Sequence, residues 1–514
     1  MDPTSPSATS PSGNPKDFKM LDPPFLLADL PQTGRLHRQH GRRRYSGALL
    51  FMVLSSLAVA FSIFGVSRQL HHGEPGSLAG AVRPDQAGAS SATGRPVLRR
   101  VDDERRLPPD AARGKQYLAQ ALSALELKKA QEASGPPASE NAREALKMLA
   151  YHLSGGFSRK IVGQTVRLEE IAPFDDSVTQ TFGTEYEVTR FLGEGLFSLI
   201  LEVKDKESQR FFALRVPFGA NQEDQEEIQA SRSTSEDEDS DEEGDSTEER
   251  VTQELSELLL SEEEGIRTAL DKTPAAKGAS HRGIAVPLAT AELEDMPADL
   301  YADGLVVSNK VQLTELFYGD LETLVEHSPL LPLDAKVYIA QRLLLQVLYL
   351  QEIGACHNDL KLSSCFMRAD GSFLLGDFAS TNVAGTEAGK FVGATLAFIE
   401  PELFMSIKKG LETATPVVPE AKSDLWSLGA LLYELFTGDL PYGLSAPAHS
   451  MDRLYLHLTE LLQRDISSAV LVPDMTKSHV PERWQELLTR LLQVKREKRI
   501  TADEVMREFS DLWQ

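Results

Sequence analysis

Residues 356–367 read CHNDLKLSSCFM and place His357, Asp359 and Lys361 at every second position. A long amphipathic pattern over residues 334–352 precedes this stretch, and the apolar run LLGDFAS of residues 374–380 follows it. Apolar spacings of three and four residues favour a helix before the stretch. We therefore expect a loop between two buried elements.

Further blocks lie on both sides of this stretch. They are FLGEGLFSLILEV (191–203), FFALRVP (211–217), VQLTELFYGDLETLVE (311–326), FIEPELF (398–404), SDLWSLGALLYELFTGDLPY (423–442) and RLLQVKREKRITADEVM (490–506). In this order the blocks resemble the protein kinase superfamily from residue 191 almost to the C-terminus. The resemblance implies an α+β fold with two lobes, a small β-rich lobe and a large helical lobe.

The resemblance gives the residues of the central stretch their expected roles. Asp359 would accept the proton of a substrate hydroxyl, and Lys361 would steady the transferring phosphoryl group. Ser364 stands where the family has a metal-binding asparagine, and a hydroxyl reaches less far than an amide oxygen. Asn358 stands where arginine is usual, so a switch through a phosphorylated activation loop is not expected.

Asp377 in LLGDFAS would be the main Mg²⁺ ligand, with Ser364 as a weakened second ligand. Ala379 takes the place of a glycine, and alanine has a steric cost at positive φ that glycine lacks. We therefore expect a stiffer loop after Asp377.

The resemblance also implies an ATP site between the lobes. Arg215 replaces the lysine that grips the phosphates, and its planar fork suits bidentate partners better than a single point between phosphate and carboxylate. Glu254 is the proposed helix partner of this position, and Phe366 is expected to stack on the adenine or to crowd it. The candidate nucleotide-binding residues are Gly193, Gly195, Ile200, Ala213, Arg215, Glu315, Phe317 and Phe366.

Other positions have expected structural roles in the large lobe. Asp424 would hold the backbone of the catalytic loop, and Trp426 and Gly429 would pack in a buried helix. Arg499 would form an ion pair with Glu402. These blocks are less altered than the catalytic ones.

Composition limits the function classes. The chain has 514 residues, 41% of them hydrophobic, and a formal net charge of −24. Nucleic-acid-binding proteins need a basic face for phosphate, so the excess of acidic residues argues against that class. The two cysteines, Cys356 and Cys365, do not suggest a disulfide framework.

The N-terminal part has a different organisation. Residues 46–66 form an uncharged run long enough to cross a bilayer, and arginines precede it. The segment is interpreted either as a signal anchor or as a cleaved signal peptide. Both interpretations place the rest of the chain in the secretory pathway. The expected regions are a disordered basic leader (1–45), this segment (46–66), a linker (67–110), a helical N-terminal extension (111–180) and a kinase-like domain (181–514) with an acidic insert (222–250).

This organisation resembles the rhoptry kinase family of apicomplexan parasites, which contains both kinases and pseudokinases. The resemblance implies passage through a rhoptry to the parasitophorous vacuole or host cell, and a protein partner or regulated kinase. Two functions remain open: a pseudokinase that can bind ATP and Mg²⁺ and acts as a scaffold or regulator, or an atypical active serine/threonine protein kinase. Membrane association is a further expectation, and the sequence does not decide the oligomeric state.

Overall fold

The computed structural model describes most of the chain after residue 107. The described residues are 108–131, 139–174, 181–195, 197–220, 255, 264–267, 283–302, 304–328, 330–386, 394–413 and 417–513. The expected leader, the apolar segment 46–66 and the acidic insert 222–250 lie outside them. Among the helices in these ranges, none is both long and apolar enough to cross a membrane.

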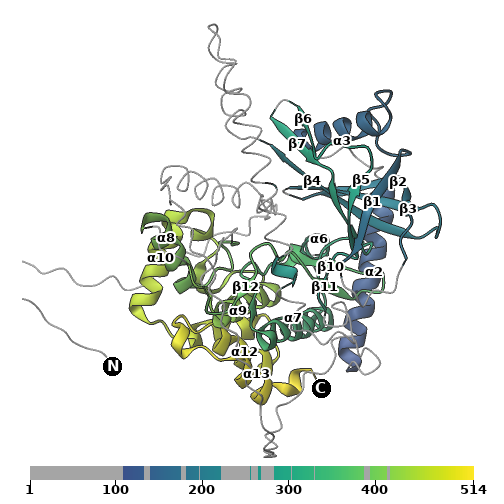
Figure 1. The fold of residues 1–514 in the computed structure, drawn as a ribbon. Helices are drawn as coiled ribbons and strands as arrows, with labels where there is room; N and C mark the ends of the chain where they lie inside the picture. The colour runs from purple at the N-terminus through teal and green to yellow at the C-terminus, as the bar shows by residue number, and fades with distance from the viewer. Residues whose placement is uncertain are drawn as a thin grey trace, which may run out of the picture. The chain divides into compact units, whose positions relative to one another are not determined.

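The small lobe is built on an antiparallel sheet (Figure 1). Its strands are β1 (Thr165–Pro173), β2 (Glu185–Glu194), β3 (Ser198–Asp205), β4 (Phe211–Ala220), β5 (Ala289–Leu293), β6 (Asp299–Ala302), β7 (Leu305–Ser308) and β8 (Lys310–Thr314). The strand order is β3-β2-β1-β5-β8-β4-β7-β6, and β3 also pairs with β4. This extra pairing closes six of the strands into a ring, so their inner side chains share one core.

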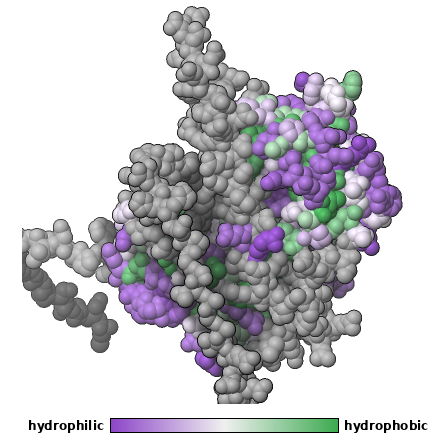
Figure 2. All heavy atoms as spheres, in the orientation of Figure 1, coloured by the Kyte–Doolittle hydropathy of each residue, from purple (hydrophilic) through white to green (hydrophobic). Residues whose placement is uncertain are grey.

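Alternating side chains fill that core. Leu199, Leu201 and Val203 of β3 are fully buried, and Tyr186 and Val188 of β2 face them. Successive side chains of a strand point to opposite faces, so one face of each strand is buried. In Figure 2 hydrophilic residues dominate the described surface of the small lobe, with hydrophobic ones scattered among them.

The segment before the sheet contains two helices, where the sequence predicts a helical extension. They are α2 (Pro109–Gln131), which packs on α7 of the large lobe, and α3 (Glu140–Leu153), which packs on β7 and β4. Ser139 caps α3 by accepting a hydrogen bond from Ala142 N–H. The extension is not helical throughout, because β1 joins the sheet between β2 and β5 and buries Val166 and Leu168.

The large lobe is mainly helical. Its helices are α6 (Leu321–His327), α7 (Leu333–Ile353), α8 (Pro401–Thr413), α9 (Ala421–Thr437), α10 (Met451–Arg464), α11 (Val472–Lys477), α12 (Glu482–Leu491) and α13 (Ala502–Glu508). Its short strands are β9 (Ala355–Cys356), β10 (Cys365–Met367), β11 (Phe373–Leu375) and β12 (Asn382–Val383). β9 pairs with β12 and β10 with β11, which brackets the stretch 356–367. Cys356 and Cys365 are buried free thiols.

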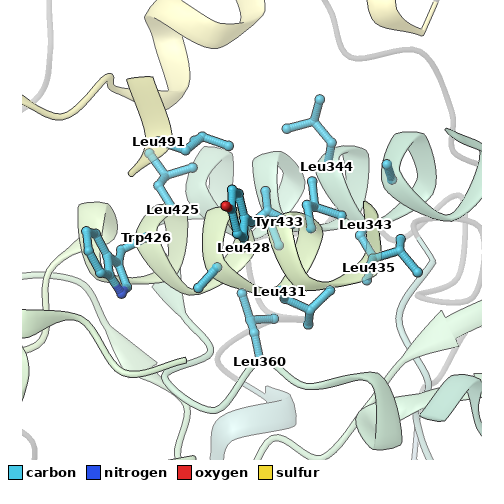
Figure 3. Close-up of a cluster of buried hydrophobic side chains, with 14 of the residues drawn as sticks. Leu343, Leu344, Leu360, Leu425, Trp426, Leu428, Leu431, Tyr433, Leu435 and Leu491 are labelled. Carbon is cyan, nitrogen blue, oxygen red and sulfur yellow. The ribbon is translucent and has the colours of Figure 1, made fainter. Parts of the chain in front are cut away.

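Helix α9 lies at the centre of this lobe. Figure 3 shows its leucines between Leu343 and Leu344 of α7 and Leu491 of α12. Gly429 allows the close approach of α12, because an added Cβ would lie 2.9 Å from the Cβ of Leu491. Trp426 stacks on Tyr442 with ring centroids 5.9 Å apart. The expected packing roles of Trp426 and Gly429 agree with these contacts.

The expected ion pair between Arg499 and Glu402 is wrong. Arg499 Nη1 instead contacts Glu400 Oε1 at 2.7 Å, and both side chains are fully buried. Arg496 also binds Glu400, through Nε at 2.8 Å, and it approaches Glu402 at 3.4 Å. The two guanidinium groups hold the pKa of Glu400 below its ordinary value against the opposing effect of burial. A buried carboxylate needs such partners, whereas Glu402 stays partly solvated.

Replacement of Glu400 should therefore destabilise the domain strongly. Glu400→Gln leaves two guanidinium groups without their anion, which costs about 3–5 kcal/mol for a buried pair. The free energy of unfolding from guanidinium chloride titration, monitored by tryptophan fluorescence, would measure the loss.

Glu402→Gln is the matched control, because the Glu402 side chain is 32% exposed. It should cost less than about 1 kcal/mol. Equal losses in the two variants would contradict the assignment of Glu400 as the buried partner.

Candidate functional site

Three of the predicted nucleotide-binding residues share one face of the small-lobe sheet. Phe212, Leu214 and Val216 of β4 belong to the core, so Ala213 and Arg215 lie on the opposite face. On β3 the same alternation places Ile200 on that face, directly across from Arg215 in the register. The structure thus brings together Ile200, Ala213 and Arg215.

The Gly-rich turn joins β2 to β3. Gly195 N–H donates to Ser198 O at 2.8 Å, which closes the turn. A Cβ added to Gly193 would meet no atom within 4 Å, so the turn leaves open space at this position. The N-terminus of α3 holds the turn, because Ser139 N–H and Oγ donate to the carboxylate of Glu194 at 2.9 and 3.0 Å. Sequence reasoning did not identify this link.

Arg215 is placed between the two lobes. Its Nη1 donates to Gln312 Oε1 of β8 at 3.3 Å. Its charge also contributes to lowering the pKa of Asp377. Arg215 therefore keeps a positive charge at the expected phosphate position, although one guanidinium nitrogen is already hydrogen-bonded to the neutral amide of Gln312. Glu254, its predicted helix partner, lies outside the described residues.

The connection between the lobes is tied to β10. The carboxylate of Glu315 makes a bidentate ion pair with Arg368 at 2.7 and 2.8 Å. Phe317 stacks on Phe366 with ring centroids 5.4 Å apart. Gly376 makes room for Phe366, since a Cβ there would lie 2.5 Å from its ring. The stacking on Phe317 fixes the ring of Phe366 in the position where the sequence predicts a contact with the lower face of adenine.

Asp424 positions the catalytic loop as the sequence predicts. Its two carboxylate oxygens accept His357 N–H at 2.6 Å and Asn358 N–H at 2.8 Å. Asp359 N–H points at His357 Nδ1 at 3.3 Å, and His357 Nε2 lies 2.9 Å from Gly376 O. This arrangement requires the tautomer with the proton on Nε2, which donates to Gly376 O.

Asp359 and Lys361 are in contact, and a third residue orients them. Asp359 Oδ1 accepts hydrogen bonds from Thr395 N–H at 2.7 Å and from Thr395 Oγ at 2.6 Å, and Oδ2 forms an ion pair with Lys361. Sequence reasoning missed Thr395. Nothing in the sequence distinguishes it from Thr381 or other threonines of the region, because its role depends on the folded path of residues 394–399.

Lys361 also reaches the expected metal ligand. Its Nζ lies 2.9 Å from Asp377 Oδ2. Burial lowers the pKa of Lys361, but Asp377 and Asp359 outweigh that effect and hold the pKa above its ordinary value. Burial raises the pKa of Asp377, and Lys361 outweighs it, so the pKa falls to about 2. The two groups form a charged pair near neutral pH.

The residues expected to hold Mg²⁺ do not fit a divalent cation well. Ser364 is buried at the end of a 3₁₀ turn (Leu362–Ser364), and its hydroxyl donates to Asp377 Oδ2 at 3.2 Å. The same oxygen faces the Lys361 ammonium. Mg²⁺ prefers several oxygen ligands that are free to point at it. Across the described residues, no three His, Cys, Asp or Glu side chains form a group that could hold a metal.

Asn358 links the catalytic loop to the segment after Asp377. Its Nδ2 donates to Ser380 O at 2.7 Å and to Asn382 Oδ1 at 2.8 Å. These are neutral contacts that need no phosphate. Asn358 and Asp377 both have positive φ, at 66° and 65°, whereas Ala379 does not. The steric cost expected at Ala379 is therefore absent from this conformation.

Phe378 packs beneath the catalytic loop. Its ring is fully buried, 5.2 Å from the ring of His357 between centroids. Gly265 lies against the backbone here, since an added Cβ would be 2.2 Å from Phe378 O. The segment that contains Asp377 is thus fixed by the contact of Phe378 with His357 and by the close approach of Gly265 to the Phe378 backbone.

Sequence comparison agrees with this architecture. The family model described as "Protein kinase domain" matches residues 306–509. The serine/threonine-protein kinase cds1 of Schizosaccharomyces pombe is 27% identical over 192 residues, which is 37% of this chain and 38% of that protein. The serine/threonine-protein kinase ROP17 of Toxoplasma gondii is 27% identical over 159 residues, 30% of this chain and 24% of that protein. The chain therefore matches well under half the length of either relative.

Solved structures with a related fold include rhoptry proteins. One is ROP2 from Toxoplasma gondii, described as a virulence factor with a protein-kinase fold and no enzymatic activity; it is 17% identical, with a TM-score of 0.48, over 79% of this chain and 96% of that one. Another is the ROP18 kinase domain in complex with AMP-PNP and sucrose, 17% identical, with a TM-score of 0.49, over 78% and 93%.

The family match covers the hinge and the large lobe, and the catalytic loop, its Asp424 anchor and the segment of Asp377 lie within it. Residues 306–509 of this chain therefore match a protein kinase domain.

Proposed function

We propose that this chain is a pseudokinase of the rhoptry kinase type, which binds an adenine nucleotide and regulates or scaffolds a protein partner. One observation supports this most directly: Ser364, in the position of the metal-binding asparagine, is buried and donates its hydroxyl to Asp377. Phosphoryl transfer depends almost wholly on positioning and charge stabilisation of the phosphates. A site that orients its metal ligand toward a hydroxyl and an ammonium should transfer phosphate poorly.

Nucleotide binding is supported by a separate set of residues. Ile200 and Ala213 provide apolar contacts above the expected adenine plane, and the ring of Phe366 provides them below. The turn at Gly193 has room for phosphates. Arg215 supplies a positive charge. None of these features requires the metal.

An atypical active serine/threonine kinase is the second candidate. Asp359 keeps two hydrogen bonds from Thr395 and an ion pair with Lys361, so its carboxylate is oriented rather than displaced. A base held in this way satisfies one requirement of phosphoryl transfer. The pseudokinase proposal differs from this one, because it predicts that the altered metal-binding residues prevent phosphate transfer even though Asp359 is well oriented.

The site of action rests on resemblance. The likeness to ROP17 and the apolar segment 46–66 support passage through the secretory pathway and a rhoptry, with action at the vacuole or in the host cell. The proposed partner is a protein that the chain regulates, such as another kinase, and affinity capture with the full chain would identify it.

Phosphate transfer should be absent or very slow in the wild-type chain. Incubation with Mg²⁺ and radiolabelled ATP should give no incorporation above that of Asp359→Asn. The double variant Ser364→Asn/Arg215→Lys, which restores the family's residues, should raise incorporation at least about tenfold. Adding Asp359→Asn to the double variant should abolish the gain. Strong wild-type incorporation that Asp359→Asn removes would favour the active kinase.

ATP should raise the melting temperature of the wild-type chain. Ala213→Phe should remove this shift, because Ala213 is 4% exposed on the cleft face and a larger side chain would fill the adenine space. Phe211→Ala is the control on the same strand, since Phe211 is 47% exposed at its start. A full ATP-dependent shift in Ala213→Phe would contradict the proposed adenine site.

A further inference from the structure

The ammonium of Lys361 lies between the two carboxylates of the cleft. Its Nζ is 2.9 Å from Asp377 Oδ2 and forms an ion pair with Asp359 Oδ2. The Lys361 side chain is 19% exposed and that of Asp359 is 7% exposed, so water screens their contact only weakly. A cation of this chain therefore occupies the point where the two anions converge.

Hydrogen bonds from hydroxyl and backbone groups add to these ion pairs. Ser364 Oγ donates to Asp377 Oδ2 at 3.2 Å, and Thr395 donates twice to Asp359 Oδ1. Three of the four carboxylate oxygens thus accept bonds from the protein itself. A divalent ion would have to displace these donors before it could coordinate the oxygens, and it would meet an ammonium at close range.

Among the described residues, two cations face the two aspartates of the site without a metal. Asp359 and Asp377 contribute two negative charges, and Lys361 and Arg215 contribute two positive charges. Arg215 lies close enough to Asp377 for its charge to act on that carboxylate. The phosphates of a bound nucleotide would therefore face Lys361 and Arg215, two cations that the protein already holds beside Asp359 and Asp377.

We propose that Lys361 takes the place of the divalent cation, so that the cleft binds adenine nucleotides without Mg²⁺ and holds their phosphates with Lys361 and Arg215. This inference rests on the proposed nucleotide-binding function and specifies its cofactor requirement. A metal-free nucleotide keeps the full charge of its phosphates, and the two side chains neutralise part of it. The same arrangement leaves no ion to bridge the phosphates for transfer.

Binding of a fluorescent ATP analogue to the full chain, with EDTA or with MgCl₂, tests the proposal. The dissociation constant should differ by less than about threefold between the two conditions. Lys361→Met removes the internal cation, so its affinity in EDTA should fall at least about tenfold, and Mg²⁺ should recover part of the loss. Lys361→Arg should keep most of the affinity in EDTA, because it keeps the charge.

Direct metal binding gives a second measurement that does not involve nucleotide. Mn²⁺ titration followed by electron paramagnetic resonance should show one more bound ion in Lys361→Met than in the wild-type chain. Lys498→Met is the control, because Lys498 is 51% exposed and pairs with Asp465 on the surface. This variant should behave as wild type in both measurements.

The outcomes separate the two proposals. Wild-type binding that disappears in EDTA and returns with Mg²⁺ overturns the role of Lys361 but keeps the nucleotide site. Absence of binding in both conditions overturns the nucleotide-binding function itself. If Lys361→Met does not fold, the wild-type comparison and the Mn²⁺ titration still decide the question.

Discussion

The buried carboxylate of Asp424 is the constraint on which the site depends. It accepts the backbone N–H groups of His357 and Asn358, and it is fully buried on the central helix α9. Burial raises its pKa, and the two N–H donors and His357 oppose that shift. A buried anion is stable only with such partners. Since the partners are backbone groups, Asp424 fixes the path of the loop rather than one side chain.

Other contacts extend this constraint across the cleft. On this loop, His357 Nε2 donates a hydrogen bond to Gly376 O, and His357 Nδ1 accepts one from Asp359 N–H. These two bonds align Asp359 with the segment that contains Asp377. Asn358 then bonds to residues 380 and 382 on the same segment. The contacts of Asn358 are neutral hydrogen bonds, and they act beside the ion pairs of Lys361 with Asp359 and Asp377.

The departures from the family change the shape and reach of side chains and, at Asn358, the charge. Arg215, Asn358 and Ser364 change which groups can face a phosphate or a metal. The surroundings of each residue provide a partner: Gln312 accepts from the guanidinium, Ser380 O and Asn382 Oδ1 accept from the asparagine amide, and Asp377 accepts from the hydroxyl. Phosphoryl transfer depends on positioning, so these substitutions act on the property that matters most for it.

The sequence alone indicated the two lobes and the roles of Asp424 and Gly429 through its resemblance to protein kinases, and a helical extension before the kinase-like domain through its apolar spacing. It did not determine β1, whose pairing is long-range, or the true partner of Arg499. Two acids two residues apart, Glu400 and Glu402, look alike in sequence, and only burial separates them. Thr395 and the bridge from Lys361 to Asp377 likewise depend on segments brought together by folding. Only the tertiary structure could decide these contacts, because the strength of a charge interaction depends on distance and desolvation, which a linear pattern does not contain.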